Sequence, residues 1–308
     1  MCRNVIVIVG PTAVGKTAVA VELVSELGGE IISADSMAIY TGMDIGTAKP
    51  TPEERSRARF RLIDAADPAK QFSVGEFQRL AREAIDGVLE SNPPAIVVGG
   101  SGLYVRAAVD GLDLDIPERN DELRAALAEE AREFGNESVH NKLAAVDPES
   151  AERIHPNNLK RVIRAIEIFE MSGVPASRLF ARESTRGSGY PSARWFGLTM
   201  NRDALYKRID KRVDAMIEVG LVEEVAGLMR LGIDPNMPSM QGLGYKEIAR
   251  FLRGECDLEE AIALLKGNTR RFAKRQYTWF RADARVQWID ADALTAKKVS
   301  ETIKGELS

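Results

Sequence analysis

GPTAVGKT, from Gly10 to Thr17, is the most informative segment of the sequence for the fold. It has the spacing GxxxxGK[ST], follows the apolar run VIVIV at residues 5–9 and opens a segment with helical periodicity. In that setting the glycines let backbone N–H groups point toward phosphate oxygens, and the helix N-terminus adds a favourable dipole. Lys16 supplies a positive charge, and the Thr17 hydroxyl is placed to bind Mg²⁺. The motif therefore predicts a polyphosphate site with magnesium, without specifying the reaction.

Strand and helix patterns alternate around this loop. A second strand pattern, EIISA, covers residues 30–34, a helical pattern covers 75–91, and a further strand pattern, AIVVGG, ends in the turn GGSG at 99–102. Alternation of this kind predicts a parallel sheet with right-handed crossovers. We therefore expect an α/β fold with a P-loop, nucleoside-triphosphatase-like core.

The pattern changes after about residue 113. The next part of the chain is helical and charged, and strand character returns at residues 193–200 and 285–290, with helices expected between them at 203–231, 244–253 and 257–281. We predict an α/β core made of residues 1–113 and 194–290, an inserted helical domain at 114–193 and a polar C-terminal tail at 291–308.

The composition is that of a soluble globular protein. Hydrophobic residues make up 44% of the 308 residues, and no apolar run approaches the roughly 18 residues of a membrane span. We expect a cytoplasmic protein with no membrane segment. Two scattered cysteines and two histidines leave little room for a zinc site or a Ser-His-Asp triad. Any proton transfer then falls to a carboxylate.

Polar residues follow the predicted strands. Asp35 and Ser36 come after the second strand, and Ser101 lies in the GGSG turn. Because the carboxyl ends of parallel strands line one edge of a sheet, Asp35, Ser101 and Lys16 should converge there. Asp35 would either bind magnesium through water or accept a proton. Residues of these types also suit a helix cap or a strand-end turn.

Basic residues are concentrated in two segments, although the net charge is −4. From Lys266 to Arg281 there are six bases and no acids, with aromatic residues between them. This composition suits phosphate contacts and base stacking, although the aromatic side chains suit a place in the core better. The paired bases at i,i+4 spacing are Arg270 with Lys274 and Arg271 with Arg275, and the second cluster is Lys160, Arg161 and Arg164. We expect these segments to bind nucleic acid.

Arg208 and Arg212 form another i,i+4 pair, in the stretch KRIDKRV. If this face meets the phosphate loop, one or both could clamp the distal phosphate. The alternative is a surface helix whose arginines pair with Asp210 and Asp214.

Together these segments resemble the tRNA dimethylallyltransferases, also called tRNA isopentenyltransferases. The phosphate loop alone is shared with many kinases, but the combination of segments is far more specific. The matching segments are GPTAVGKT, SADSMAIYTGMDIGTAKPT, GGSGLYVRA, IHPNNLKRVIRAIEI, KRIDKRVDAMIEVGLVEEV, QGLGYKEI and NTRRFAKRQYTWFR. The resemblance implies transfer of a dimethylallyl group from dimethylallyl diphosphate to N6 of the adenosine just 3′ of the anticodon, with intact diphosphate as the leaving group.

The resemblance also implies roles for individual residues. Lys16 and Mg²⁺ bound through Thr17 would stabilise the departing diphosphate. Asp35 would be the general base for the N6 amine, and Ser101 would hydrogen-bond near the reacting centre. The catalytic residues are then Asp35, Ser101 and Lys16. The residues expected to bind the diphosphate are Gly10, Pro11, Thr12, Ala13, Val14, Gly15, Lys16, Thr17 and one of Arg208 and Arg212.

The resemblance further implies that the target adenosine is extruded from the anticodon loop and that the insertion closes over the stem-loop. We expect a monomer whose partners are the tRNA anticodon stem-loop and dimethylallyl diphosphate, with Mg²⁺ as cofactor. The residues expected to contact tRNA, by resemblance or through the basic segments, are Asp35, Ser36, Met37, Ala38, Ser101, Arg124, Lys160, Arg161, Val162, Ile163, Arg164, Gln241, Gly244, Lys246, Arg270, Arg271, Lys274 and Arg275.

Three positions depart from the family pattern. Ala38 stands where glutamine is usual, Phe60 and Arg61 replace a pair of histidines, and Ser101 replaces threonine while keeping the hydroxyl. None of these changes removes a charged catalytic group, but Ala38 removes one polar contact to RNA.

Three other functions remain as alternatives. A small-molecule kinase would need no basic aromatic segment. A prenyltransferase acting on free adenine nucleotides would need no tRNA-contacting insertion. A non-catalytic RNA-binding module would need neither Asp35 nor the pair Lys16 and Thr17.

Overall fold

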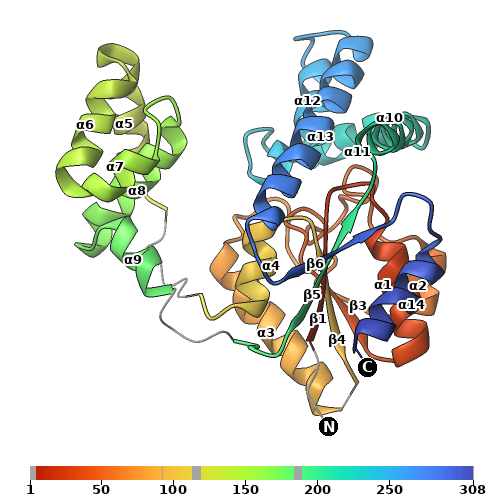
Figure 1. Ribbon diagram of the computed structural model, residues 1–308. Helices are drawn as coiled ribbons and strands as arrows, with labels where there is room; N and C mark the ends of the chain where they lie inside the picture. Colours follow the sequence, from red (N-terminus) through yellow and green to blue (C-terminus); the bar gives the residue numbers. More distant parts are fainter. Residues whose placement is uncertain (1–4, 92, 113–118, 184–188, 308) are drawn as a thin grey trace. The chain divides into compact units, whose positions relative to one another are not determined.

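The computed structural model describes residues 5–91, 93–112, 119–183 and 189–307 (Figure 1). The chain divides into two compact units. The first joins Met1–Val109 to Tyr190–Ser308, and the second is Asp110–Gly189. The second unit therefore interrupts the first in sequence, as an insertion does.

A parallel sheet of six strands forms the centre of the first unit, in the order β3-β2-β4-β1-β5-β6. Its strands are β1 (Val5–Val9), β2 (Glu30–Ser33), β3 (Phe60–Arg61), β4 (Ala95–Gly99), β5 (Arg194–Thr199) and β6 (Val286–Asp290). All of β1 is buried, as its continuous apolar sequence predicts for a central parallel strand. Because every pair is parallel, all carboxyl ends lie at one edge of the sheet.

Helices cover both faces of the sheet (Figure 1). One face carries α1 (Lys16–Leu27), α2 (Pro52–Arg57) and α14 (Ala296–Leu307), and the other carries α3 (Val74–Glu90) and α4 (Gly102–Val109). Beyond the carboxyl edge lie α10 (Arg202–Glu218), α11 (Leu221–Arg230), the short η1 (Ser239–Gln241), α12 (Tyr245–Leu252) and α13 (Leu258–Arg281). The predicted α/β class is confirmed, and these last helices form the surroundings of the strand ends.

The C-terminal segment differs from its prediction. The expectation of a polar tail at residues 291–308 is wrong, because Ala296–Leu307 form helix α14. Its Val299 and Ile303 are almost fully buried in the core that includes α1. The many charged residues of this segment hide a narrow apolar stripe at i,i+4 spacing, which is enough to dock a helix.

Two further differences concern short features. The single helix expected at residues 203–231 is two helices, α10 and α11, because Gly220 adopts a φ of 105° at the start of α11. Strand β3 has only two residues, which is too short to show a periodic pattern in the sequence.

Every regular element among the described residues of the second unit is a helix. It contains α5 (Asp121–Phe134), α6 (Asn136–Val146), α7 (Pro148–Arg153), α8 (Leu159–Ser172) and α9 (Ala176–Glu183). Apolar residues of α5, α6 and α8 form its core, among them Val139, Leu143 and Ile166. Asn120 and Asp147 cap the N-termini of α5 and α7, so the starts of these helices are fixed by neighbouring residues.

Candidate active site

The phosphate-binding loop joins β1 to α1 through unusual backbone angles. Gly10 and Gly15 have φ values of 143° and 103°, and Ala13 has a φ of 65°. A Cβ on Gly10 would lie 2.7 Å from the carbonyl oxygen of Leu198, so only glycine fits there. No side chain caps the start of α1, and its first turn carries no acid. The N–H groups of the loop and helix start are thus suited to an anion.

Lys16 turns back onto its own loop. Its Nζ donates hydrogen bonds to the carbonyl oxygens of Gly10, at 2.9 Å, and Pro11, at 2.8 Å. Burial lowers the pKa of Lys16 to about 8, with the nearby Asp35 carboxylate opposing this shift and Arg212 adding to it. The ammonium group is held in the loop by carbonyl oxygens, where an anionic ligand would interact with it strongly.

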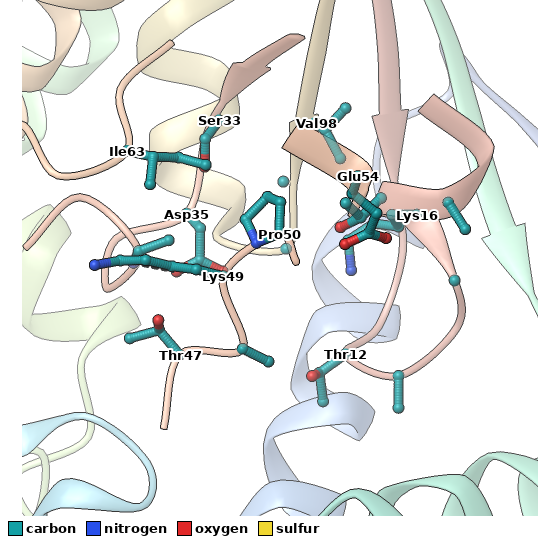
Figure 2. A pocket seen from close by; sticks show the side chains of 18 of the residues that line it. Thr12, Lys16, Ser33, Asp35, Thr47, Lys49, Pro50, Glu54, Ile63 and Val98 are labelled. Carbon is teal, nitrogen blue, oxygen red and sulfur yellow. Dashed lines mark hydrogen bonds between the residues drawn. The ribbon is translucent and has the colours of Figure 1, made fainter. Parts of the chain in front are cut away.

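A cavity of about 470 Å³ lies beside the phosphate loop, and we call it the loop-side cavity (Figure 2). Figure 2 shows Lys16 reaching it from the phosphate loop and Asp35 from the end of β2. The predicted site residues that line it are Thr12, Ala13, Gly15, Lys16, Thr17, Asp35, Ala38, Arg208 and Arg212. Gly10, Pro11 and Val14 of the loop are buried and do not line it.

A second cavity, of about 320 Å³, lies against α10 and α13, and we call it the helix-side cavity. The predicted site residues that line it are Thr12, Asp35, Ser36, Met37, Ser101, Arg212, Gln241, Lys246 and Arg275. Five residues line both cavities, namely Thr12, Asp35, Thr47, Arg212 and Phe272. The two cavities are therefore neighbours, and Asp35 belongs to both.

Asp35 is held by its own turn. Its Oδ1 accepts hydrogen bonds from the backbone N–H groups of Met37, at 2.8 Å, and Ala38, at 3.3 Å. Among the described residues no hydrogen bond is recorded for the other oxygen, Oδ2. The carboxylate is thus fixed through one oxygen while the second remains able to accept a proton.

Ser36 and Ser101 connect the ends of two strands. The two hydroxyl oxygens are 3.1 Å apart, and the backbone N–H of Ser36 donates to Ser101 Oγ at 3.4 Å. The sequence expectation was that Asp35, Ser101 and Lys16 converge. Asp35 and Lys16 share the loop-side cavity, whereas Asp35 and Ser101 share the helix-side cavity. Of these three residues, Asp35 is the one that shares a cavity with each of the other two, Lys16 and Ser101.

Arg208 and Arg212, the two predicted arginines of α10, both reach the loop-side cavity, but they differ in burial. Arg208 is exposed and Arg212 is partly buried, and only Arg212 also lines the helix-side cavity. Burial lowers the pKa of Arg212, while the charges of Asp35 and Glu54 raise it. The acids Asp210 and Asp214 pair instead with bases of α13, so the alternative of a salt-bridged arginine pair on α10 is not what the structure contains.

The basic residues of α13 have different surroundings. Arg270 donates to both carboxylate oxygens of Asp210, Arg271 donates to Asn268 Oδ1 at 2.8 Å, and Lys274 is exposed. Arg275 lines the helix-side cavity. Of the four predicted RNA-contacting bases on this helix, Arg275 alone therefore faces a cavity with Asp35.

The aromatic residues of the same helix also divide. Phe280 is buried in the core, and Phe272 lines both cavities. Trp279 is 43% exposed, and its indole lies so close to Gly102 that a Cβ there would collide with it. An exposed indole beside the turn that carries Ser101 is suited to stacking on a base.

Two of the predicted RNA-contacting residues in the second unit have buried side chains. Val162 and Ile163 are buried in the core of that unit, because they face inward on α8 while their neighbours face out. Their side chains are not available to RNA. Lys160 and Arg161 are exposed and remain predictions.

Arg124 and Arg164, from the same prediction, both pair with Glu167. Glu167 is fully buried and also accepts a hydrogen bond from the backbone N–H of Asn120 at 2.7 Å. Burial raises the pKa of Glu167, but hydrogen bonds from Arg124 and Arg164 outweigh this and lower the pKa to about 2. The side chains of Arg124 and Arg164 remain 30% and 32% exposed, so they still reach the surface while they pair with Glu167.

Gly244 and Lys246 come from the third predicted RNA segment. Gly244 is buried and lines neither cavity, and its N–H donates to the Glu247 carboxylate at 2.9 Å. Lys246 and Gln241 line the helix-side cavity. In this segment the side chains of Gln241 and Lys246 line the helix-side cavity, while Gly244 precedes the first residue of α12.

The sequence did not single out three further polar residues: Lys49 and Gln276, which line the loop-side cavity, and Glu224, which lines neither cavity but holds the turn at residues 44–46. Lys49 has a 3% exposed side chain whose ammonium donates to Tyr40 O and Asp44 Oδ1, both at 2.7 Å. Glu224 accepts hydrogen bonds from three consecutive backbone N–H groups, at residues 44–46, and from Tyr245. Gln276 bridges the phosphate loop and the GGSG turn. The partners of Glu224 and Gln276 are far away in the sequence, and those of Lys49 lie in an irregular loop, so no periodic pattern marks these residues.

The described residues contain no cluster of three or more His, Cys, Asp or Glu side chains that could hold a metal ion. The oxygen-bearing side chains Thr17, Asp35 and Glu54 do line the loop-side cavity. This donor set fits a magnesium ion that takes most of its ligands from phosphate oxygens and water, which is the common mode for Mg²⁺.

Within the described part of the chain, every helix is too short or too polar to cross a bilayer.

The chain is similar to known proteins along nearly its whole length. A family model described as IPP transferase matches residues 38–283. The tRNA dimethylallyltransferase of Alkaliphilus oremlandii is 51% identical over 290 residues, which cover 94% of this chain and 92% of that protein.

Solved structures agree with this similarity. The full-length tRNA isopentenylpyrophosphate transferase from Bacillus halodurans aligns with a TM-score of 0.73 and 43% identity, covering 99% of this chain and 97% of that one. A eukaryotic dimethylallyltransferase acting on tRNA aligns with a TM-score of 0.81 and 25% identity, covering 99% of this chain and 78% of that one.

Proposed function

We propose the function of this chain from one premise: it belongs to the IPP transferase family. It is a tRNA-modifying enzyme that transfers a dimethylallyl group from dimethylallyl diphosphate to tRNA. The acceptor is N6 of the adenosine that follows the anticodon on its 3′ side, and the second product is diphosphate.

One observation carries this proposal beyond family membership. Asp35 lines both cavities, one bounded by the phosphate loop and the other by Ser101 and the basic helix α13. A group-transfer enzyme needs two substrate sites that meet at the reacting atoms. Dimethylallyl diphosphate would occupy the loop-side cavity, and the extruded adenine would enter the helix-side cavity, with Asp35 between them.

The phosphate loop holds the leaving group in this proposal. The bond that breaks joins the allylic carbon to the bridging oxygen, and its electron pair goes to the diphosphate. The negative charge that develops there is stabilised by the loop N–H groups, by Lys16 and by an arginine of α10. Because Arg212 also lines the second cavity, we assign the clamp beside the reacting carbon to Arg212 and an outer contact to Arg208.

Asp35 accepts the proton in this proposal. The N6 nitrogen forms the new bond to the allylic carbon and loses one proton to Asp35 Oδ2. Oδ1 keeps its hydrogen bonds to Met37 and Ala38, so the carboxylate stays oriented throughout. The Ser101 hydroxyl, 3.1 Å from Ser36 Oγ, is placed to hydrogen-bond the adenine or the Asp35 turn.

Magnesium would be held by the Thr17 hydroxyl together with diphosphate oxygens and water. When bound, it supplies positive charge to the leaving diphosphate.

The anticodon stem-loop would lie over the helix-side cavity. Ser36, Met37, Gln241, Lys246 and Arg275 line that cavity, while Arg271 and Lys274 continue the basic surface along α13. Arg124, Lys160, Arg161 and Arg164 of the second unit would contact the backbone of the stem-loop. We expect a monomer, acting on tRNA in the cytoplasm.

The test is a transfer assay with two labelled donors. The protein is incubated with unmodified tRNA and dimethylallyl diphosphate labelled in the prenyl group, and separately with labelled ATP and small-molecule acceptors. We expect prenyl label in tRNA and none of the ATP label in acceptors. Phosphorylated acceptors would support a kinase, and prenyl label in AMP in preference to an anticodon stem-loop would support a transferase of free nucleotides.

A further inference from the structure

Gln276 is a buried amide between two loops that come from different parts of the sequence. Its side-chain oxygen, Oε1, accepts a hydrogen bond from the backbone N–H of Thr12 at 2.8 Å. Its nitrogen, Nε2, donates to the carbonyl oxygen of Gly100 at 2.9 Å. The residue is only 5% exposed. One side chain thus connects the phosphate loop to the GGSG turn.

The surroundings are built closely around this amide. A Cβ on Gly100 would collide with Gln276 Nε2, so the turn approaches the amide as only glycine allows. The neighbouring Ser101 lines the helix-side cavity, and Thr12 lines both cavities. The two loops joined by Gln276 therefore each carry a residue of the reaction site.

Helix α13 supplies this connection from the wall that the two cavities share. Phe272 lines both cavities, Arg275 lines the helix-side cavity, and Gln276 lines the loop-side cavity. Gln276 makes no contact in the helix-side cavity itself, so its influence on the acceptor passes through Gly100 and Ser101.

We propose that Gln276 is a positioning residue that sets the separation between the diphosphate site and the adenine site. The proposal rests on the function proposed above, because that reaction requires the allylic carbon and the N6 nitrogen to meet in line. Thr12 and Gly100 would each move if the amide were lost, since a partly buried N–H and a buried carbonyl would lack partners. Each substrate would still find its own cavity, but the two reacting atoms would no longer be aligned.

The expected signature is therefore a loss of turnover without a loss of binding. In Gln276→Leu we expect kcat to fall by about 10- to 100-fold, since misplacements near 1 Å have effects of that order. We expect the KM values for dimethylallyl diphosphate and for tRNA to stay within about threefold of the wild-type values. Calorimetric titration with dimethylallyl diphosphate alone should give a nearly unchanged Kd.

A second variant, Gln276→Glu, gives a readout that a purely space-filling role would not produce. A protonated glutamic acid keeps one acceptor for Thr12 N–H and one donor for Gly100 O, whereas the carboxylate has no donor and faces the carbonyl oxygen. Burial raises the pKa of a carboxyl group. The ratio of variant kcat to wild-type kcat should therefore rise as the pH is lowered from about 8 to about 6.

Other titrating groups near the amide also affect the pH dependence of kcat, and their effect must be removed from this measurement. The charged side chains of the loop-side cavity are Lys16, Asp35, Lys49, Glu54, Arg208 and Arg212, and Arg275 is the adjacent residue on α13. All are shared by the wild type and the variant, so the ratio of the two pH profiles removes their contribution. Gln287→Glu, at an exposed position of β6, is the matched control and should give a ratio that does not change with pH.

The possible results separate the proposal from its premise. A wild-type protein that transfers no prenyl label would refute the proposed function itself. With an active wild type, unchanged kcat in both Gln276 variants, a KM increase without a kcat decrease, or a pH-independent ratio for Gln276→Glu would each overturn the positioning role. If Gln276→Leu is unfolded by circular dichroism, the Gln276→Glu ratio decides alone.

Discussion

The ammonium group of Lys16 donates a hydrogen bond to the carbonyl oxygen of Pro11, at 2.8 Å, within the loop that is proposed to hold the diphosphate. Because burial lowers the pKa of Lys16 to about 8, part of its charge is lost within the ordinary working range of pH. Lys16 is charged below that pH and becomes neutral above it.

The first prediction concerns this proton. A bound diphosphate raises the pKa of Lys16, so binding above the free pKa must take up a proton. We expect the Kd for dimethylallyl diphosphate to rise as the pH increases from about 8, by up to about tenfold per pH unit. Calorimetry in two buffers of different ionisation enthalpy measures the proton uptake. Lys16→Met should bind weakly with no break near this pH, and a pH-independent wild-type affinity would contradict the assignment.

Asp35 is predicted to act through its second oxygen. Asp35→Asn keeps an oxygen that can accept from the N–H groups of Met37 and Ala38, so the turn should be preserved. Loss of the base should lower single-turnover rates by about 10²-fold or more, while the Kd for the anticodon stem-loop changes little. Asp35→Ala should additionally disturb the turn. Turnover of Asp35→Asn at the wild-type rate would exclude Asp35 as the base.

Arg212 and Arg208 should differ when each is replaced by glutamine. Arg212 lines both cavities, whereas Arg208 lines only the loop-side cavity and is exposed. We expect Arg212→Gln to lower kcat/KM for the prenyl donor by about 10²-fold, and Arg208→Gln by about tenfold with most of the change in KM. Arg202→Gln, whose side chain is 80% exposed at the start of α10, is the control. Equal losses of kcat/KM in Arg212→Gln and Arg208→Gln would contradict the different roles assigned to the two arginines.

The basic side chains of α13 should contribute unequally to RNA binding. Arg275 lines the helix-side cavity, but Arg270 is held by Asp210. We expect Arg275→Ala to reduce the slope of log K against log salt concentration by about 0.7, the value for one single-stranded phosphate contact. Arg270→Ala should reduce it less. Filter binding of an anticodon stem-loop across a salt series measures both, and a larger change for Arg270→Ala would contradict the assignment.

Glu167 should stabilise the second unit. Its carboxylate is buried against Arg124 and Arg164, and its pKa is lowered from 4.5 to about 2. A lowered pKa in the folded state means that this stabilisation is complete above pH 4.5 and is lost as the pH falls toward 2.

Replacing Glu167 by glutamine should lower the free energy of unfolding by about 3 kcal/mol at neutral pH, because two arginines lose their buried partner. Urea denaturation measures the change, and Glu170→Gln, at an exposed position of the same helix, should have almost no effect. Equal stability of the two variants would show that the buried group is not what supports this unit.

The main elements of the fold could be predicted because their signals are local. The sequence VIVIV followed by GPTAVGKT predicts a buried strand, an anion-binding turn and the start of a helix within 13 neighbouring residues. The structure has β1 and α1 there. Gly220, by contrast, divides a continuous helical pattern, and the apolar stripe of α14 is diluted by charged residues. These features depend on backbone angles and tertiary packing that a periodic pattern does not encode.

The site could be predicted only in part for the same reason. Asp35 and Ser101 follow strands, so sheet topology brings them to one edge. The partners of Gln276 and Glu224 lie far from them in the sequence, as does Arg124, one of the two arginines that pair with Glu167. Nothing in the neighbouring residues indicates those hydrogen bonds. Val162 and Ile163 show that a basic segment on a helix also contains residues that face the core, which its composition does not indicate.

The strand order has a consequence for how the newly made chain folds during translation. Strand β1 pairs with β4 on one side and with β5 on the other, but β5 follows the whole second unit in the sequence. Until β5 leaves the ribosome, the apolar edge of VIVIV has no partner, and an unpaired edge of this kind favours aggregation. The helical unit, whose core is made by nearby segments, can fold in that interval. Slow synthesis through residues 110–189 would thus prolong the exposure of β1.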